Sequence, residues 1–255
     1  MTEDPDEKTA LQKKALQYAE DAKHQYLTIS FISPRGGTNW AEGACLWYYL
    51  GLASRETNLS TKRELLGKAL EVAPDILKRA EKSGYPEIKG EVHSMFANLL
   101  RESAKIEANF EEKKRLLETA LVHNDEAVAI SEQVEPLAYW NLGFMRGGAV
   151  ASRYALADLA KDPETKKNML QRVLLDSEEA LGLCIKGLTS YPGEDATPLL
   201  RIVGGWEVYN GECWHRLYEI TNDKEYLKRA IEAFQRGIET YEKTNQTSRD
   251  RKSVV

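Results

Sequence analysis

The chain carries the same pattern of apolar and polar positions five times. In each copy apolar residues recur at steps of three and four with charged residues between them, and the copies read KKALQYAEDA, GKALEVAPDI, ETALVHNDEA, QRVLLDSEEA and KRAIEAFQRG. Such steps place the apolar side chains on one stripe of an α-helix. The anchor residues are separated by 54, 51, 53 and 57 positions, and they are Ala15, Ala69, Ala120, Val173 and Ala230. A period this even predicts a stack of helical units rather than an ordinary globular core.

Each copy predicts one amphipathic helix, and the charge and capping residues suggest where it begins. The predicted helices lie near 8–28, 61–82, 111–133, 163–189 and 223–243. Thr61, Asp162 and Asp223 are placed to cap three of them, because short polar side chains accept hydrogen bonds from first-turn amides. Pro163 suits a first helical position.

Longer segments, richer in aromatic and small residues, lie between the copies and predict the partner helix of each unit. They span roughly 40–57, 90–110, 136–160 and 198–220. Small residues recur at similar places in them, namely Gly51, Ala97, Gly143 and Gly211. Glycine within a helix costs about 1 kcal/mol relative to alanine. We therefore expect these positions to mark close approaches between helix axes.

Two segments carry a known repeat signature. Residues 47–51, WYYLG, fit W-x2-L-G, and residues 230–237, AIEAFQRG, nearly fit A-x3-F-x2-A. The chain resembles a tetratricopeptide-repeat protein over almost its whole length, most strongly at 206–241. The spacing departs from the family period of about 34, so the units are divergent.

The resemblance implies an all-α fold, a right-handed superhelical solenoid of antiparallel helix pairs. We expect one repeat domain over 1–243, since a repeat array can use this length as a single body. The apolar pattern stops after Lys243, so we expect 244–255 to be a disordered tail or a tail of artefactual origin.

In that family the first helices line a concave groove that receives a peptide or a partner helix. Corresponding positions around the small residues then predict a groove lined by Tyr48, Leu52, Arg55, Asn98, Arg101, Trp140, Phe144, Glu212 and His215. Arg55 and Arg101 are equivalent in adjacent units, and two guanidiniums in register could clamp a carboxylate or phosphate. The alternative is that each arginine pairs with Glu56, Glu102 or a neighbouring helix. Trp140 and Phe144 could form an aromatic wall or belong to the core.

Composition and charge exclude several partners. The net charge of -5 carries no basic block, which argues against a nucleic-acid partner. No run of about 18 apolar residues is present for a membrane span. The acidic, polar N-terminus lacks the apolar core of a signal peptide. Three scattered cysteines, Cys45, Cys184 and Cys213, suggest a reducing compartment. These features predict a cytoplasmic protein.

No constellation of residues indicates catalysis. The four histidines fall in different units without metal-ligand spacing, and the Cys213 and His215 side chains, two positions apart, should point to different sides of a helix. We therefore predict no catalytic residue, metal or cofactor. The expected function is a non-catalytic scaffold or adaptor that binds a protein or peptide, acidic or phosphorylated if the two arginines act together. The alternative is an N-terminal sensor or regulatory module of a larger signalling protein or enzyme. The pattern does not specify the partner or the oligomeric state.

Overall fold

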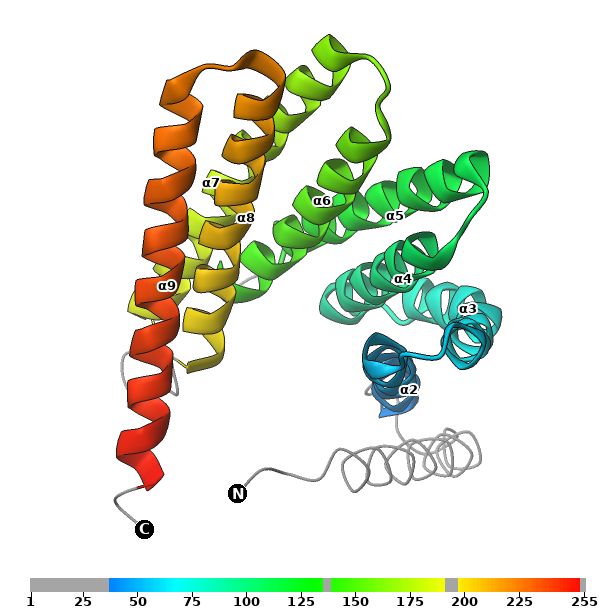
Figure 1. The fold of residues 1–255 in the computed structure, drawn as a ribbon. Helices are drawn as coiled ribbons and strands as arrows, with labels where there is room; N and C mark the ends of the chain where they lie inside the picture. Colours follow the sequence, from blue (N-terminus) through cyan, green and yellow to red (C-terminus); the bar gives the residue numbers. More distant parts are fainter. Residues whose placement is uncertain (1–36, 135–138, 191–196, 253–255) are drawn as a thin grey trace. The chain divides into compact units, whose positions relative to one another are not determined.

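The computed structural model of the chain describes residues 37–134, 139–190 and 197–252. These residues form consecutive α-helices and contain no strand (Figure 1). The helices are α2 (Gly37–Arg55), α3 (Leu59–Lys82), α4 (Pro86–Ile106), α5 (Phe110–Ser131), α6 (Tyr139–Leu159), α7 (Pro163–Ser190), α8 (Thr197–Thr221) and α9 (Lys224–Lys252). The prediction of an all-α, repeat-like chain is confirmed for these residues.

The predicted helices correspond closely to the observed ones. The later four phrase copies are α3, α5, α7 and α9, and the segments between them are α2, α4, α6 and α8. The first copy, 8–28, lies outside the described residues. Helix α9 continues to Lys252, so the predicted end at Lys243 was wrong. Residues 244–252 contain no proline or glycine, and a loss of apolar residues alone does not stop a helix.

The chain divides into two compact units, which differs from the single domain predicted over 1–243. The N-terminal unit is Met1–Val134, with α2 to α5, and the C-terminal unit is Glu135–Val255, with α6 to α9. Within each unit every helix packs against its neighbours in sequence, and the first helices also meet, α2 with α4 and α6 with α8. The boundary falls between Val134 and Glu135, directly before Pro136 in the sequence.

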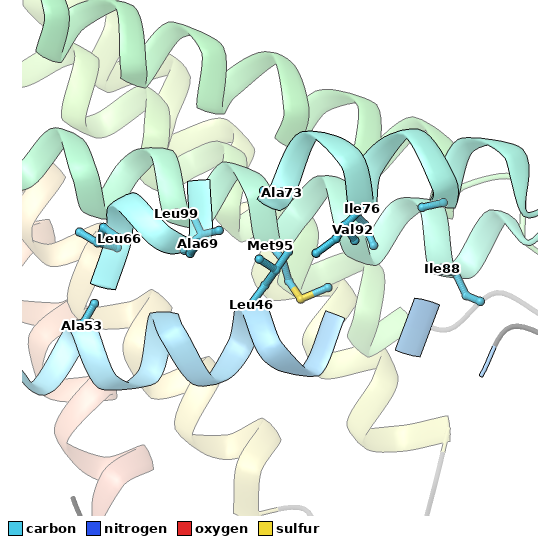
Figure 2. Close-up of a cluster of buried hydrophobic side chains, with 11 residues drawn as sticks. Leu46, Ala53, Leu66, Ala69, Ala73, Ile76, Ile88, Val92, Met95 and Leu99 are labelled. Atoms are coloured by element: carbon cyan, nitrogen blue, oxygen red, sulfur yellow. The ribbon is translucent and has the colours of Figure 1, made fainter. Parts of the chain in front are cut away.

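The core of the N-terminal unit lies between α2, α3 and α4. Leu46 of α2, Leu66 of α3 and Leu99 of α4 are almost completely buried there (Figure 2). Alanines on α3 share this core, and their small side chains leave room for larger residues such as Met95. Burying each leucine contributes about 1.5–3 kcal/mol relative to exposure, so this cluster holds the three helices together.

The predicted close approaches are confirmed at two of the glycines and wrong at one. A β-carbon at Gly143 would lie 2.6 Å from Cys184 Sγ and 3.0 Å from the carbonyl oxygen of Ala180. One at Gly211 would lie 2.6 Å from the Phe234 ring. At Gly51 it would meet no atom within 4 Å, so this glycine faces open space.

Side-chain caps begin the second helices. Asp162 Oδ2 accepts from the Thr165 amide at 2.7 Å and Asp223 Oδ1 from the Glu225 amide at 3.0 Å, as predicted. The predicted cap at Thr61 was wrong, because α3 begins earlier at Leu59.

In the N-terminal unit, asparagine side chains cap the first turns of α3 and α5. Asn58 Oδ1 accepts from the amides of Ser60 and Thr61 at 2.9 and 3.2 Å, and Asn109 Oδ1 accepts from the Glu112 amide at 3.0 Å. The amide of each asparagine in turn donates to the glutamate two residues earlier, at 2.8 Å in both turns. The repeated Glu-x-Asn sequence thus sets where α3 and α5 begin.

We expect Asn58→Ala to destabilise the N-terminal unit by about 0.5–2 kcal/mol, because two first-turn amides lose their acceptor. Asn58→Asp keeps the acceptor oxygen and serves as the control. Chemical denaturation followed by circular dichroism measures the difference. Equal stability of Asn58→Ala and the parent chain would show that water replaces the cap without loss.

Candidate functional site

The predicted groove residues of the N-terminal unit divide into surface and interior positions. Tyr48 is 38% exposed and Arg55 is exposed, both on α2. Leu52 and Asn98 are each only 7% exposed, so their place in a surface groove is not supported. Counting positions from the small residue of each helix gave the right helical turn for these two side chains but the wrong face. Both side chains are buried because α2 and α4 pack there against neighbouring helices.

The two arginines differ in their surroundings. Arg101 is half-buried, and its Nη2 donates to Asn98 Oδ1 at 2.6 Å. Arg55 forms no ion pair within the residues that the structure describes. The acidic neighbours have other contacts, since Glu102 pairs with Lys62 and Lys105, and Glu56 accepts the amide of the α3 cap.

An aromatic ring, a glycine and a cationic side chain lie on one face of α2. Tyr48, Gly51 and Arg55 are three and then four positions apart, so they share a helix face. A β-carbon at Gly51 would meet nothing within 4 Å, so the space directly beside this glycine is open. Helix α4, which carries Arg101, packs against α2. We refer to Tyr48, Gly51, Arg55 and Arg101 as the α2–α4 surface.

The predicted groove residues of the C-terminal unit differ in their exposure. Phe144 is half-buried, whereas Glu212 and His215 are exposed on α8, and the side chain of Trp140 lies outside the described part of the chain. His215 Nδ1 lies 3.9 Å from Glu219 Oε1 on its own helix. The space beside Gly147 on α6 is filled by an indole from α8. A β-carbon at Gly147 would lie 1.8 Å from Trp206 Cζ2.

A histidine pair between α4 and α5, with His93 buried and His123 half-buried, was missed by the sequence reasoning. His93 Nδ1 and His123 Nδ1 are 3.0 Å apart, and the Phe96 ring lies 4.7 Å from the His123 ring, centroid to centroid. His93 is 5% exposed, and its Nε2 is buried without a hydrogen-bond partner. Thirty positions separate the two histidines, so no local motif could have joined them.

The surroundings of this pair keep both imidazoles neutral. Burial, followed by the neighbouring His123, lowers the pKa of His93 to about 4, although Glu126 opposes the shift. Burial also lowers the pKa of His123. Two neutral rings can share one hydrogen bond when one Nδ1 carries the proton and the other accepts it. The pair therefore acts as a hydrogen bond between helices, and protonation of both rings would break it.

A small open pocket lies at the end of α3 near this pair. Its volume is about 230 Å³, and it is lined by Ala80, Glu81, Gly84, Tyr85, Pro86, Lys89, Ile130 and Gln133. Lys89 Nζ lies 3.4 Å from Glu126 Oε1, so the positive charge of this lining residue is already paired with a carboxylate. Sites for small molecules usually exceed about 300 Å³ and are more apolar, so this pocket is a weak candidate for a ligand site.

The thiols of Cys184 and Cys213 are buried and poor nucleophiles. Burial raises the pKa of Cys184 to about 11, and burial also raises the pKa of Cys213. Thiols with these pKa values stay protonated at neutral pH. Cys213 is fully buried while His215 is exposed, so the two side chains do point to different sides of α8.

The described residues provide neither a metal site nor a membrane-spanning helix. No group of three or more His, Cys, Asp or Glu side chains in the described residues is placed to hold a metal ion. None of the described helices combines the length and the apolar character that a bilayer crossing requires.

The chain is similar to known proteins only at a distance. No protein-family model matches the sequence, and no curated protein matches it. Among solved structures, a chain of the DHF58 filament is 17% identical, with 96% of this chain and 99% of that chain covered and a TM-score of 0.41. The de novo designed helical repeat protein DHR64 is 19% identical over 95% and 98%, with a TM-score of 0.38. BtubC (BKLC) from P. vanneervenii is 12% identical over 92% of each chain, with a TM-score of 0.36. Matches this distant identify neither a family nor a function.

Proposed function

We propose that this chain is a non-catalytic scaffold whose α2–α4 surface binds a peptide that carries a carboxylate or phosphate group. The observation that supports the proposal most directly is Arg55, an exposed guanidinium without an ion pair in the described ranges, beside the open space at Gly51. A tetratricopeptide-like, right-handed stacking of the hairpins is part of the same proposal.

The α2–α4 surface offers three different contacts to an extended peptide. The Tyr48 ring provides apolar area and a hydroxyl group, which suits an interface that is partly wet. The missing side chain at Gly51 lets the peptide backbone approach the helix. Arg55 can bind a carboxylate or phosphate bidentately, and Arg101, oriented by Asn98, supplies a second guanidinium from α4.

We expect Arg55→Ala combined with Arg101→Ala to weaken binding of acidic peptides about tenfold or more, since each charged hydrogen bond contributes about 1.5–3 kcal/mol. The probe is a peptide array in which every sequence is displayed in phosphoserine, glutamate and glutamine forms. Binding of the first two forms should fall as salt is added, because salt screens the attraction.

Arg115→Ala is the matched control, because Arg115 is an exposed arginine on α5 that pairs with Glu112. It should leave binding unchanged. Gly51→Leu should block the peptide while the protein stays folded, because it fills the open space. Equal binding of the glutamate and glutamine forms, or full binding by the double arginine variant, would refute the proposal.

A further inference from the structure

Helix α9 carries two apolar stripes, and the second of them is only partly covered inside the C-terminal unit. Tyr226, Ala230, Ala233 and Gly237 follow one stripe, which faces α8. A second stripe lies one position further on, at steps of four, three, four and three, and consists of Leu227, Ile231, Phe234, Ile238 and Tyr241. We call this second stripe the α9 seam. Phe234 and Tyr241 lie partly against the glycines of α8, near Gly211 and Gly204, whereas Ile231 and Ile238 are 52% and 57% exposed.

The corresponding positions of α3 and α7 are covered. In α3, Leu70 and Leu77 lie one and eight positions after the anchor residue Ala69. Both are half-buried against the core shared with α4. In α7, which packs against α8, Leu174 at the first of these positions is 4% exposed. Ile231 of α9 occupies the same position, and no described helix covers it. The α9 seam therefore repeats a helix-binding interface that is occupied elsewhere in the chain.

We propose that a second copy of this chain covers the α9 seam, with the two α9 helices antiparallel. Ile231 and Ile238 are exposed and one heptad apart, which is a spacing by which helices associate along their length. An isologous contact of this kind places the same stripe on both copies around a two-fold axis. The proposal does not depend on the α2–α4 surface.

The charges beside the α9 seam favour the antiparallel direction. Lys224 and Lys228 lie at its beginning, whereas Glu239 and Glu242 lie at its end, and none of the four forms an ion pair in the described part of the chain. In an antiparallel pair the basic end of one copy faces the acidic end of the other, on both sides of the two-fold axis. A parallel pair would bring like charges together, which is unfavourable. Gln235, midway between the charged ends, then lies close to the axis.

Sedimentation equilibrium of the full chain at several concentrations tests the proposal. We expect a reversible monomer–dimer equilibrium that Ile238→Glu shifts to monomer, because two carboxylates would be buried at the contact. Ile185→Glu is the matched control, since Ile185 is another exposed isoleucine, on α7 instead of the seam, with 46% of its surface accessible against 57% for Ile238. It should leave the dimer intact. A chain that is monomeric throughout, or an equal loss with Ile185→Glu, would overturn the proposal.

Charge exchange tests the direction of the helices. Lys228→Glu and Glu242→Lys should each weaken the dimer about 2- to 30-fold, because each change converts two attractive contacts into repulsive ones. The double variant Lys228→Glu/Glu242→Lys restores opposite charges in an antiparallel pair, so it should dimerise as the parent chain does. A double variant as weak as the single ones, or single variants without effect, would overturn the antiparallel arrangement.

Discussion

Gly143→Leu should lower the free energy of unfolding of the C-terminal unit by about 1–3 kcal/mol. Helix α7 approaches α6 so closely at Gly143 that a β-carbon would lie 3.0 Å from the carbonyl oxygen of Ala180 and 3.1 Å from the amide nitrogen of Cys184. Because these atoms belong to the backbone, no side-chain rotation can relieve the clash, and the two helices must separate. The separation opens space around Cys184 and loses dispersion contacts along the interface.

Gly51→Leu is the control for helix propensity. Leucine favours a helix over glycine by about 1 kcal/mol, and Gly51 faces open space, so this variant should be as stable as the parent chain or more stable. Urea denaturation followed by circular dichroism measures both variants. If Gly143→Leu has an unchanged or raised midpoint, the close approach of α6 and α7 at this residue does not exist in solution.

Stability of the N-terminal unit should fall as the pH is lowered from about 6.5 to about 4. The unfolded chain protonates its histidines near pH 6.5, whereas the folded pKa of His93 is about 4 and that of His123 is also lowered. Between these values the unfolded state binds more protons, so acidification favours unfolding. The expected loss is about 1.4 kcal/mol per pH unit for His93, or about 3 kcal/mol over the whole interval.

The measurement is the free energy of unfolding from urea titrations at a series of pH values. His93→Gln should abolish most of the slope between pH 6.5 and 4, because glutamine does not titrate, even though it also loses the ring contact with His123. Above pH 7 neither imidazole titrates, so the parent chain should show no contribution from the pair there. A slope that His93→Gln leaves unchanged would assign the acid sensitivity to carboxylates elsewhere.

Local periodicity was enough to find the helices. The steps of three and four around Ala69, Ala120, Val173 and Ala230 located α3, α5, α7 and α9, because each amphipathic helix has to bury its own apolar stripe. Turn and capping chemistry located most of the starts for the same local reason. At the start of α3 the sequence reasoning selected Thr61, and only the helix geometry showed that the Asn58 oxygen faces the free amides.

Contacts between distant residues could not be found in this way, because spacing along the chain carries no information on which faces meet. Leu52 and Asn98 had the spacing of groove residues but became buried, and Gly51 had the spacing of a close approach but stayed open. His93 and His123 are joined only because α4 and α5 pack in one particular register. The amino-acid pattern therefore determines which segments are helical, because each amphipathic helix has to bury an apolar stripe. Helix packing determines which side chains remain at the surface to bind a partner, since burial and pKa depend on neighbours from other helices.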